Sequence, residues 1–529
     1  MSGEFDKFYK KIEPEIAETE KPAVGHEHEA EDQELEEALG NIWDIAEENH
    51  LDPFATKFEV VPSHIIYQMG AYGIPGRYSH WTYGRAYRQM KTQYDHGLSK
   101  IYELVINSDP SQAYLLENNP PIENKFVMAH VLGHTDFFKN NAWFAETRRD
   151  MPKSAALSAD RIRSYEEIEG HDAVEKFLDA ALAIEEHIDP HMYDRPGRDE
   201  EIKMWHEKEQ KKQQRIRDNE RRNENEWDPP VKQETVRELG RVALNIPPAP
   251  DCDVVGFIRN HAPYLEEWQR DVLDIVRSQS EYFYPQRRTK IMNEGWAAYW
   301  HKRIMREMSN RNLITPKEDE AWWKVHSGVV AHDPKSINPY YVGMKLFEYI
   351  EDRHNGNLTP KEEAWLRSQE QTVYPQFDGE LKDSPAAPVL REAMMYNDDQ
   401  SFIRNYFDKN VADRMGMYIY EKQTGFNGEE STIISSTGWQ EIRDKLVAML
   451  DNSGTPYINV INGDHDKAGQ LYLRHEFDGR SLDAEYIQKT LPYLHSLWQR
   501  PVHLETVEAS TRKKVVYTYN GVKVSKKSE

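Results

Sequence analysis

Helical periodicity runs through most of this chain and limits its possible folds more than any other feature. Apolar side chains recur three or four residues apart, the spacing that places them on one face of an α-helix. The segments with this pattern are 83–106, 123–140, 172–187, 262–283, 289–308, 340–353 and 360–370. The pattern predicts a large, mainly α-helical domain.

The pattern changes after about residue 430. Residues 439–454 and 482–499 have helical spacing, and they are interspersed with segments in which apolar and polar residues alternate, as is typical of β-strands. These four segments are 455–463, 469–479, 502–511 and 514–525. We therefore expect a C-terminal α+β domain with a small, mostly antiparallel sheet.

Two segments are rich in charged residues, and we expect neither to contribute to a packed core. Residues 1–33 are acidic and weakly apolar, which predicts a flexible tail, and residues 199–228 are densely charged, which predicts a solvated excursion. The predicted organisation is thus the tail, a helical domain over 34–429 that contains the excursion, and the α+β domain over 430–529.

Overall composition excludes several classes of partner and site. The formal net charge of −24 disfavours binding to nucleic acid or to an anionic membrane surface. The single cysteine, Cys252, excludes an internal disulfide framework and a cysteine-cluster metal site. We find no apolar run of about 18 residues and no apolar signal segment at the N-terminus, so we expect a cytoplasmic protein without a membrane span.

The segment NKFVMAHVLGHTDFF places two histidines, His130 and His134, four residues apart on a predicted helix. At this spacing both imidazoles project from one face, with Cβ atoms about 6 Å apart, so they can bind one metal ion together. A pair with this spacing also occurs for purely structural reasons, as two surface or hydrogen-bonded histidines. The pair therefore needs further ligands before it indicates a metal site.

A second helical segment, KIMNEGWAAYWHKRIMR, supplies them. Glu294, Ala298 and His301 share one face, and the small Ala298 leaves room for another helix to approach. If this face meets the histidine pair, His130, His134 and Glu294 become metal ligands, and His301 becomes a fourth ligand or a catalytic proton shuttle. Three such ligands with one open position are typical of hydrolytic zinc sites.

The sequence departs from the zincin peptidases at one position. In their HExxH motif a glutamate that acts as general base follows the first histidine, whereas Val131 stands there in this chain. A general base must then come from elsewhere. His80, beside Trp81 at the start of a predicted helix, is either a capping or core residue or a further ligand.

Long segments of the chain resemble the SpoVR-like family (stage V sporulation protein R). They occur in the family's order from about residue 58 to 407, and include GAYGIPGRYSHW, MAHVLGHTDFFKNNAWF, YFYPQRRTKIMNEGWAAYWHKRIM and NPYYVGMKLFEYIE. The resemblance implies a role in spore cortex formation or, in non-sporulating bacteria, in stationary-phase and starvation physiology. It also implies a complex with a PrkA-type serine kinase and a von Willebrand factor A-like protein.

These observations favour a metal-dependent hydrolase that acts on a peptide or another amide, or an amide or acyl transferase. Its helical domain would have a zincin-like core as one option, and its cofactor would be a divalent metal, most simply zinc. The alternative is a non-enzymatic scaffold or regulatory subunit of the kinase system, in which the buried polar groups are structural. A third hypothesis is amide or acyl transfer without metal, with a histidine as base.

Overall fold

The computed structural model describes residues 26–95, 103–189, 247, 249–333, 336–424 and 430–528. The predicted charged excursion at 199–228 lies outside these residues, as do residues 1–25 of the predicted acidic tail. The rest of that predicted tail, residues 26–33, forms the first turns of helix α2 (His26–Glu48).

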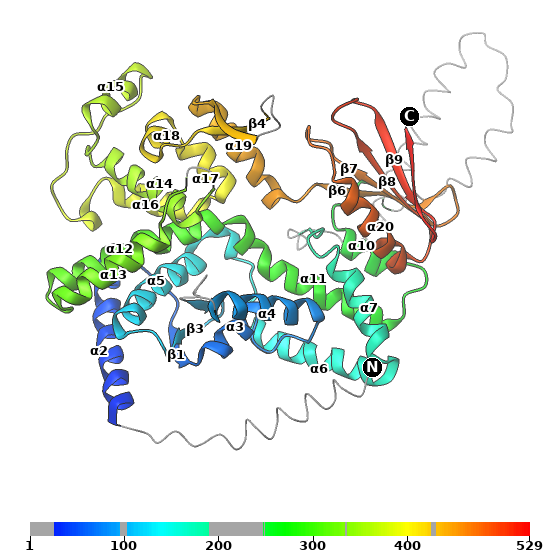
Figure 1. The fold of residues 1–529 in the computed structure, drawn as a ribbon, viewed down its shortest axis with the longest axis horizontal. Coiled ribbons are helices and arrows are strands. Elements are labelled where there is room, and N and C mark those ends of the chain that lie inside the picture. The colour runs from blue at the N-terminus through cyan, green and yellow to red at the C-terminus, as the bar shows by residue number, and fades with distance from the viewer. Residues whose placement is uncertain are drawn as a thin grey trace, which may run out of the picture.

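Three long helices form the centre of the first part of the molecule. They are α5 (Pro121–Asn140), α12 (Lys290–Asn310) and α14 (Pro339–His354). Helix α12 packs against both of the others, and Figure 1 shows it beside α5. Two segments separated by about 150 residues in sequence are thus direct neighbours in space.

Glycines allow these three helices to approach closely. A Cβ atom on Gly133 of α5 would lie 2.7 Å from the Cα atom of Ala297 on α12. On another face of α12, a Cβ atom on Gly295 would lie 2.4 Å from the Cα atom of Gly343 on α14. No other residue fits at such separations without a backbone shift, so these glycines bring the polar side chains beside them into reach of the facing helix.

Further helices surround this centre and bury one continuous apolar core. Among its largest fully buried side chains are Phe137, Trp296, Tyr299, Phe347 and Phe402. The surrounding helices that contribute to it are α2, α13 (Pro316–Val329), α16 (Ala386–Tyr396), α17 (Asp399–Tyr406), α18 (Lys409–Met415) and α19 (Trp439–Leu450). α15 (Pro360–Ser368) lies at the edge of this part of the molecule in Figure 1.

A small sheet that the sequence did not predict lies beside α5. Its strands are β1 (Thr56–Val61), β2 (Leu104–Ile106) and β3 (Ser111–Leu116), in the order β1-β3-β2, with β1 parallel and β2 antiparallel to β3. The helices α3 (Ser63–Tyr72) and α4 (Trp81–Asp95) connect β1 to the region before β2. The prediction of a helix over 83–106 is therefore wrong at its end, where edge strand β2 stands.

The predicted C-terminal sheet is confirmed, with one strand more than expected. Its order is β10-β9-β8-β7-β6, and every pair is antiparallel except β7–β8. The additional strand arises because the predicted strand over 514–525 folds back at Asn520-Gly521, a dipeptide favoured in hairpin turns. The strands are β6 (Ile458–His465), β7 (Gln470–His475), β8 (Val502–Val507), β9 (Lys514–Tyr519) and β10 (Val524–Ser528).

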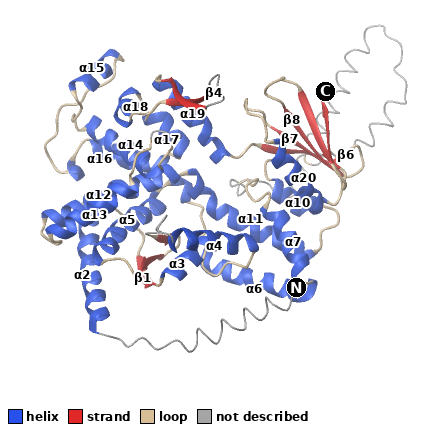
Figure 2. Ribbon diagram, viewed as in Figure 1, coloured by secondary structure: helices blue, strands red, loops and turns tan. Residues whose placement is uncertain are grey.

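The fold class is therefore as predicted: mainly helical, with a mostly antiparallel C-terminal sheet. Figure 2 shows the helices in blue across most of the molecule and the strands of the C-terminal sheet gathered at one end. A separate hairpin, β4 (Ile419–Thr424) and β5 (Glu430–Ser436), precedes α19. No helix among the described residues is long and apolar enough to cross a membrane.

The C-terminal sheet and its helix α20 (Ala484–Trp498) share a second core with helices from earlier in the chain. The ring of Trp498 stacks on Phe257 of α10 (Val254–His261), with centroids 5.8 Å apart. The other helices that contribute are α4, α6 (Met151–Glu169), α7 (His171–Leu182) and α11 (Glu267–Arg288). The predicted domain boundary near residue 430 remains a prediction, and this core crosses it. Helix α6 packs against α7 and α11.

Candidate metal centre

Helix α5 carries two buried histidines one turn apart. The side chains of His130 and His134 are almost fully enclosed, with 2% and 3% of the residue exposed, and their ring centroids are 4.6 Å apart. Every residue of this helix from 124 to 138 is buried, because other elements cover the helix on all sides. Both imidazoles therefore face protein groups rather than bulk water.

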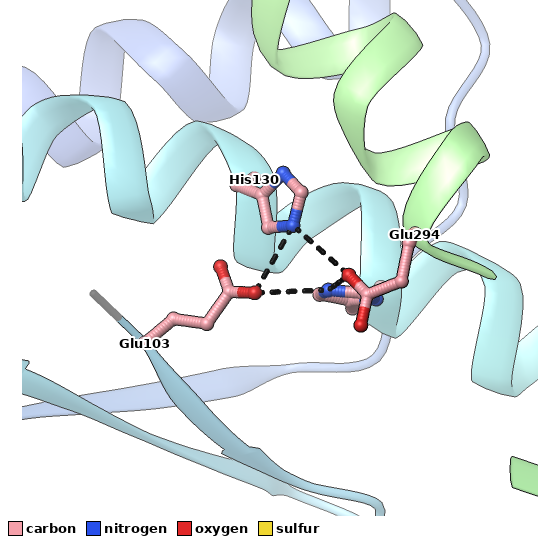
Figure 3. Close-up of side chains that lie close together, drawn as sticks. Glu103, His130 and Glu294 are labelled. Atoms are coloured by element: carbon pink, nitrogen blue, oxygen red, sulfur yellow. Dashed lines mark ion pairs between the residues drawn. The ribbon is translucent and has the colours of Figure 1, made fainter. Parts of the chain in front are cut away.

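Two carboxylates meet these imidazoles from opposite directions, as Figure 3 shows. Glu294 stands on α12, and Glu103 is the residue directly before β2. The Glu103 Oε1 atom lies 3.1 Å from His130 Nε2 and 3.4 Å from His134 Nε2. The Glu294 Oε2 atom lies 3.7 Å and 3.4 Å from the same two nitrogens. We call these four residues the donor group.

The separations within the donor group are those of ligands around one ion. One donor atom from each residue lies within 4.8 Å of all the others. Ligands that bind an ion tetrahedrally at about 2.0–2.1 Å are about 3.4 Å from one another, and the four printed nitrogen–oxygen distances run from 3.1 to 3.7 Å. The donor group could therefore hold a metal ion.

Two atoms of the donor group lack a hydrogen bond. Among the described residues, His130 Nε2 and Glu294 Oε2 are fully buried and have no hydrogen-bond partner. Leaving a buried polar atom unpaired costs about 1–3 kcal/mol, so such atoms call for an explanation. Both atoms belong to the same cluster, and a cation between them would satisfy both. The residues thus fit a metal ion.

The charge distribution also favours a cation. Burial opposes ionisation of Glu103, but the adjacent imidazoles outweigh it and lower its pKa to about 2; the same imidazoles lower the pKa of Glu294. Burial would lower the pKa of His134, but the two carboxylates raise it to about 10, and they raise the pKa of His130 as well. Without metal, the carboxylates are compensated by protons on the imidazoles, and a metal ion would replace those protons.

Neighbouring side chains fix how the donor group is oriented. His134 Nδ1 donates a hydrogen bond to Asn293 Oδ1 at 2.8 Å, so Nε2 is the nitrogen that faces the carboxylates and would bind the metal once its proton is displaced. The ammonium group of Lys290 binds Glu294 Oε1, so the other oxygen of that carboxylate points to the histidines. The ring of Tyr340 stacks on His130 at 5.9 Å.

The structure brings the three predicted ligands, His130, His134 and Glu294, to one point. His301 lies on the far side of His130, where its Nδ1 atom is 2.6 Å from His130 Nδ1, and is not one of the four donors. Its predicted role as ligand or proton shuttle remains a prediction. His80 lies elsewhere, where its Nε2 atom is 3.2 Å from Asp179 Oδ1.

Sequence reasoning missed Glu103. This residue lies within a stretch whose spacing suggested a helix, and only the pairing of β2 with β3 places it against α5. Its only local signal is a lone acid in front of the apolar residues Leu104-Val105-Ile106. That signal is common and points to no particular partner, so the residue could not have been selected from the sequence.

Comparison with known proteins places these features in a family. The family described as "SpoVR like protein" matches residues 29–455, and the family described as "SpoVR-like C-terminal domain" matches residues 456–509. A curated relative, the uncharacterized protein YcgB of Escherichia coli (strain K12), is 30% identical over 488 residues, which cover 89% of this chain and 91% of the relative. No solved structure matches the chain.

Proposed function

The chain belongs to the SpoVR-like family, and we propose that it is a metal-dependent hydrolase that cleaves a peptide or another amide bond. His130, His134 and Glu294 would hold the metal ion. The observation that carries this proposal is the convergence of buried imidazole nitrogens and carboxylate oxygens, two of them without a hydrogen bond, within 4.8 Å of one another. Zinc is the metal we propose, because it accepts nitrogen and oxygen ligands in a tetrahedral arrangement of this size.

The elements that carry the four donors suggest a division of roles. His130, His134 and Glu294 stand on α5 and α12, two helices locked together at Gly133. Glu103 stands at the start of a short edge strand, and its side chain is 19% exposed compared with 6% for Glu294. The helices would thus supply a rigid set of three ligands, and Glu103 is the donor best able to move aside for water.

This division leads to a reaction sequence in which Glu103 replaces the glutamate absent at Val131. When bound, zinc supplies Lewis-acid polarisation and makes water more acidic. Glu103 accepts a proton from the attacking water as the water oxygen bonds to the carbonyl carbon of the amide. The C–N bond then breaks, and the proton passes from Glu103 to the leaving nitrogen. His301 takes no step in this sequence, and the catalytic role as proton shuttle that the sequence predicts for it is a separate hypothesis.

For the biological setting, we propose the role that the resemblance implies. The protein would act in the cytoplasm during spore cortex formation or, in a non-sporulating bacterium, in stationary-phase and starvation physiology. A PrkA-type serine kinase and a von Willebrand factor A-like protein would be its partners.

One observation favours a second function. Glu103 lies where a fourth tetrahedral ligand would stand, and four protein ligands are typical of closed, structural zinc sites. In that case the metal would only stabilise the fold, and the chain would be a non-enzymatic scaffold or regulatory subunit of the kinase system.

The test is whether the bound metal has an open position. The purified full-length chain is loaded with cobalt(II), whose visible spectrum reports its ligands, and titrated with acetohydroxamate. A saturable spectral change supports the hydrolase proposal. No change in the wild-type chain, together with a change in a Glu103→Gln variant, would show a site closed by Glu103 and would contradict it.

The same proposal requires that the metal depend on the predicted ligands. The His130→Ala/His134→Ala variant should contain less than about one tenth of the zinc of the wild-type chain, since both nitrogen ligands are lost. A His171→Ala/His332→Ala variant, changed at two exposed histidines outside the donor group, is the matched control. Equal zinc contents in the two variants would refute the site.

A further inference from the structure

Three buried histidines form a continuous chain that begins at the donor group. His130 Nδ1 lies 2.6 Å from His301 Nδ1, and His301 Nε2 lies 2.7 Å from His326 Nδ1. They stand on three different helices, α5, α12 and α13, and are 2%, 0% and 4% exposed. Tertiary packing therefore joins the three imidazoles through two consecutive short contacts between ring nitrogens.

The chemistry of imidazole fixes the direction of both hydrogen bonds. A neutral imidazole has one N–H donor and one lone pair, so each short contact needs a donor on one side only. If His130 Nε2 binds a metal, His130 carries its proton on Nδ1 and donates it to His301 Nδ1. His301 must then carry its proton on Nε2 and donate to His326 Nδ1. One protonation pattern thus satisfies both hydrogen bonds among the three histidines.

The surroundings keep the outer two rings neutral and in place. Both rings are buried, which disfavours the charged form of an imidazole. The ring of Phe126 packs 4.2 Å from that of His301, and Trp323 packs edge-on against His326. A charged or rotated ring is therefore disfavoured at either position.

We propose that His301 and His326 are positioning residues that hold His130 in the tautomer and orientation needed for metal binding. The inference deepens the proposed function and rests on it, because it presupposes that the donor group binds metal. His301 accepts the proton of His130 Nδ1, which leaves the Nε2 lone pair of His130 directed at the carboxylates. His326 orients His301 in the same way, one step further from the metal. Outer partners of this kind typically change metal affinity by about 10–100-fold.

A pair of isosteric variants at His301 tests the first step. Asparagine places its carbonyl oxygen near the Nδ1 position and can still accept from His130, whereas glutamine reaches the Nε2 position and leaves His130 Nδ1 without an acceptor. Zinc is the probe, and the dissociation constant is measured by competition with a chelating dye on the full-length chain. We expect His301→Asn to bind within about 3-fold of wild type and His301→Gln to bind about 10–100-fold more weakly.

The second step predicts the matching result at His326. His326→Asn retains an acceptor for His301 and should bind zinc as wild type does, whereas His326→Ala should lose affinity, by less than His301→Gln does. Equal affinities for His301→Asn and His301→Gln would overturn the inference, since a merely structural histidine does not distinguish the Nδ1 from the Nε2 position. A wild-type chain that binds no zinc would instead contradict the proposed function.

A direct measurement covers the case in which a variant does not fold. In the zinc-loaded wild-type chain labelled with 15N-histidine, the spectra of the ring nitrogens report which nitrogen of each imidazole carries a proton. We expect the proton on Nδ1 of His130 and on Nε2 of His301. A proton on Nδ1 of His301 would overturn the inference, because that ring would then have no lone pair to offer to His130.

Discussion

Two pairs of histidines in this molecule have similar distances between their rings but differ in the hydrogen-bond partners of their ring nitrogens. The ring centroids of His130 and His134 are 4.6 Å apart, and those of His465 and His503 in the C-terminal sheet are 5.0 Å apart. Neither pair would be distinguished from the other by proximity alone.

The hydrogen bonds of the ring nitrogens distinguish the two pairs. In the sheet, His503 is fully satisfied: its Nδ1 atom is 2.8 Å from Thr518 Oγ1 and its Nε2 atom is 2.6 Å from Gln470 Oε1. In the donor group, His130 Nε2 has no hydrogen bond and faces two carboxylates. A buried nitrogen that has no hydrogen bond and lies against two carboxylates is therefore the feature that indicates a cation site, and clustered histidines alone are not.

The largest effect should appear when each pair is replaced by alanines in its own variant and the two variants are compared. The His130→Ala/His134→Ala variant should bind zinc more than about 1000-fold more weakly than wild type, since the loss of a single outer partner already costs about 10–100-fold. The His465→Ala/His503→Ala variant should bind zinc as wild type does. The measurement is chelator competition, and comparable losses in both variants would erase the distinction between the pairs.

Within the donor group, the two carboxylates should contribute unequally. Glu294 is anchored on α12 by Lys290, whereas Glu103 stands at a sheet edge where a water molecule can take its place. We expect Glu294→Gln to weaken zinc binding by about 100-fold and Glu103→Gln by about 10-fold. Titrations of the two variants side by side give the order, and a reversed order would show that the edge carboxylate is the principal ligand.

The donor group should also depend on the close approach of its helices. A Gly133→Ala change places a Cβ atom 2.7 Å from the Ala297 Cα atom, and such overpacking costs about 1–3 kcal/mol of folding free energy. Gly84→Ala in α4 meets nothing within 4 Å and should be neutral or stabilising. Thermal unfolding of the two variants tests this, and a Gly133→Ala variant with wild-type stability and zinc affinity would refute the tight contact.

The last prediction, with the smallest effect per step, is the pH dependence of binding. The carboxylates hold the pKa of His134 at about 10 in the metal-free protein, so at neutral pH zinc must displace a proton there. Affinity should consequently rise with pH, by about tenfold per pH unit for one proton displaced below that pKa. Titrations at several pH values, with proton release followed in weak buffer, check the slope. An affinity independent of pH over this range would mean that His134 is not a ligand.

The sequence predicted those residues of the donor group whose placement depends only on spacing within one helical segment. His130 and His134 lie four residues apart and share a helix face whatever the rest of the chain does, and Glu294 has a recognisable helical context. The same periodicity gave the long helices and hence the fold class. Spacing within two separate helices thus predicted three of the four residues that the structure brings together.

The remaining parts depend on pairing between distant segments. Glu103 reaches the centre only because β2 pairs with β3, and β3 pairs in parallel with β1, whose paired residues lie 55 positions earlier. Strands this short have little periodicity of their own, so helical spacing in the neighbouring residues obscured them. The chain from His130 through His301 to His326 was missed for a similar reason, because it joins three helices whose mutual packing the sequence does not specify.

The central claim is that one metal ion binds the imidazoles of α5 together with carboxylates from α12 and the edge of the small sheet. X-ray absorption at the zinc edge, on the full-length chain loaded with one equivalent of zinc, measures those ligands directly. The account predicts two imidazole nitrogens at about 2.0–2.1 Å and oxygen ligands at about 2.0–2.2 Å in a four- or five-coordinate shell, without sulfur at about 2.3 Å. A shell without imidazole, or one that contains the sulfur of Cys252, would contradict it.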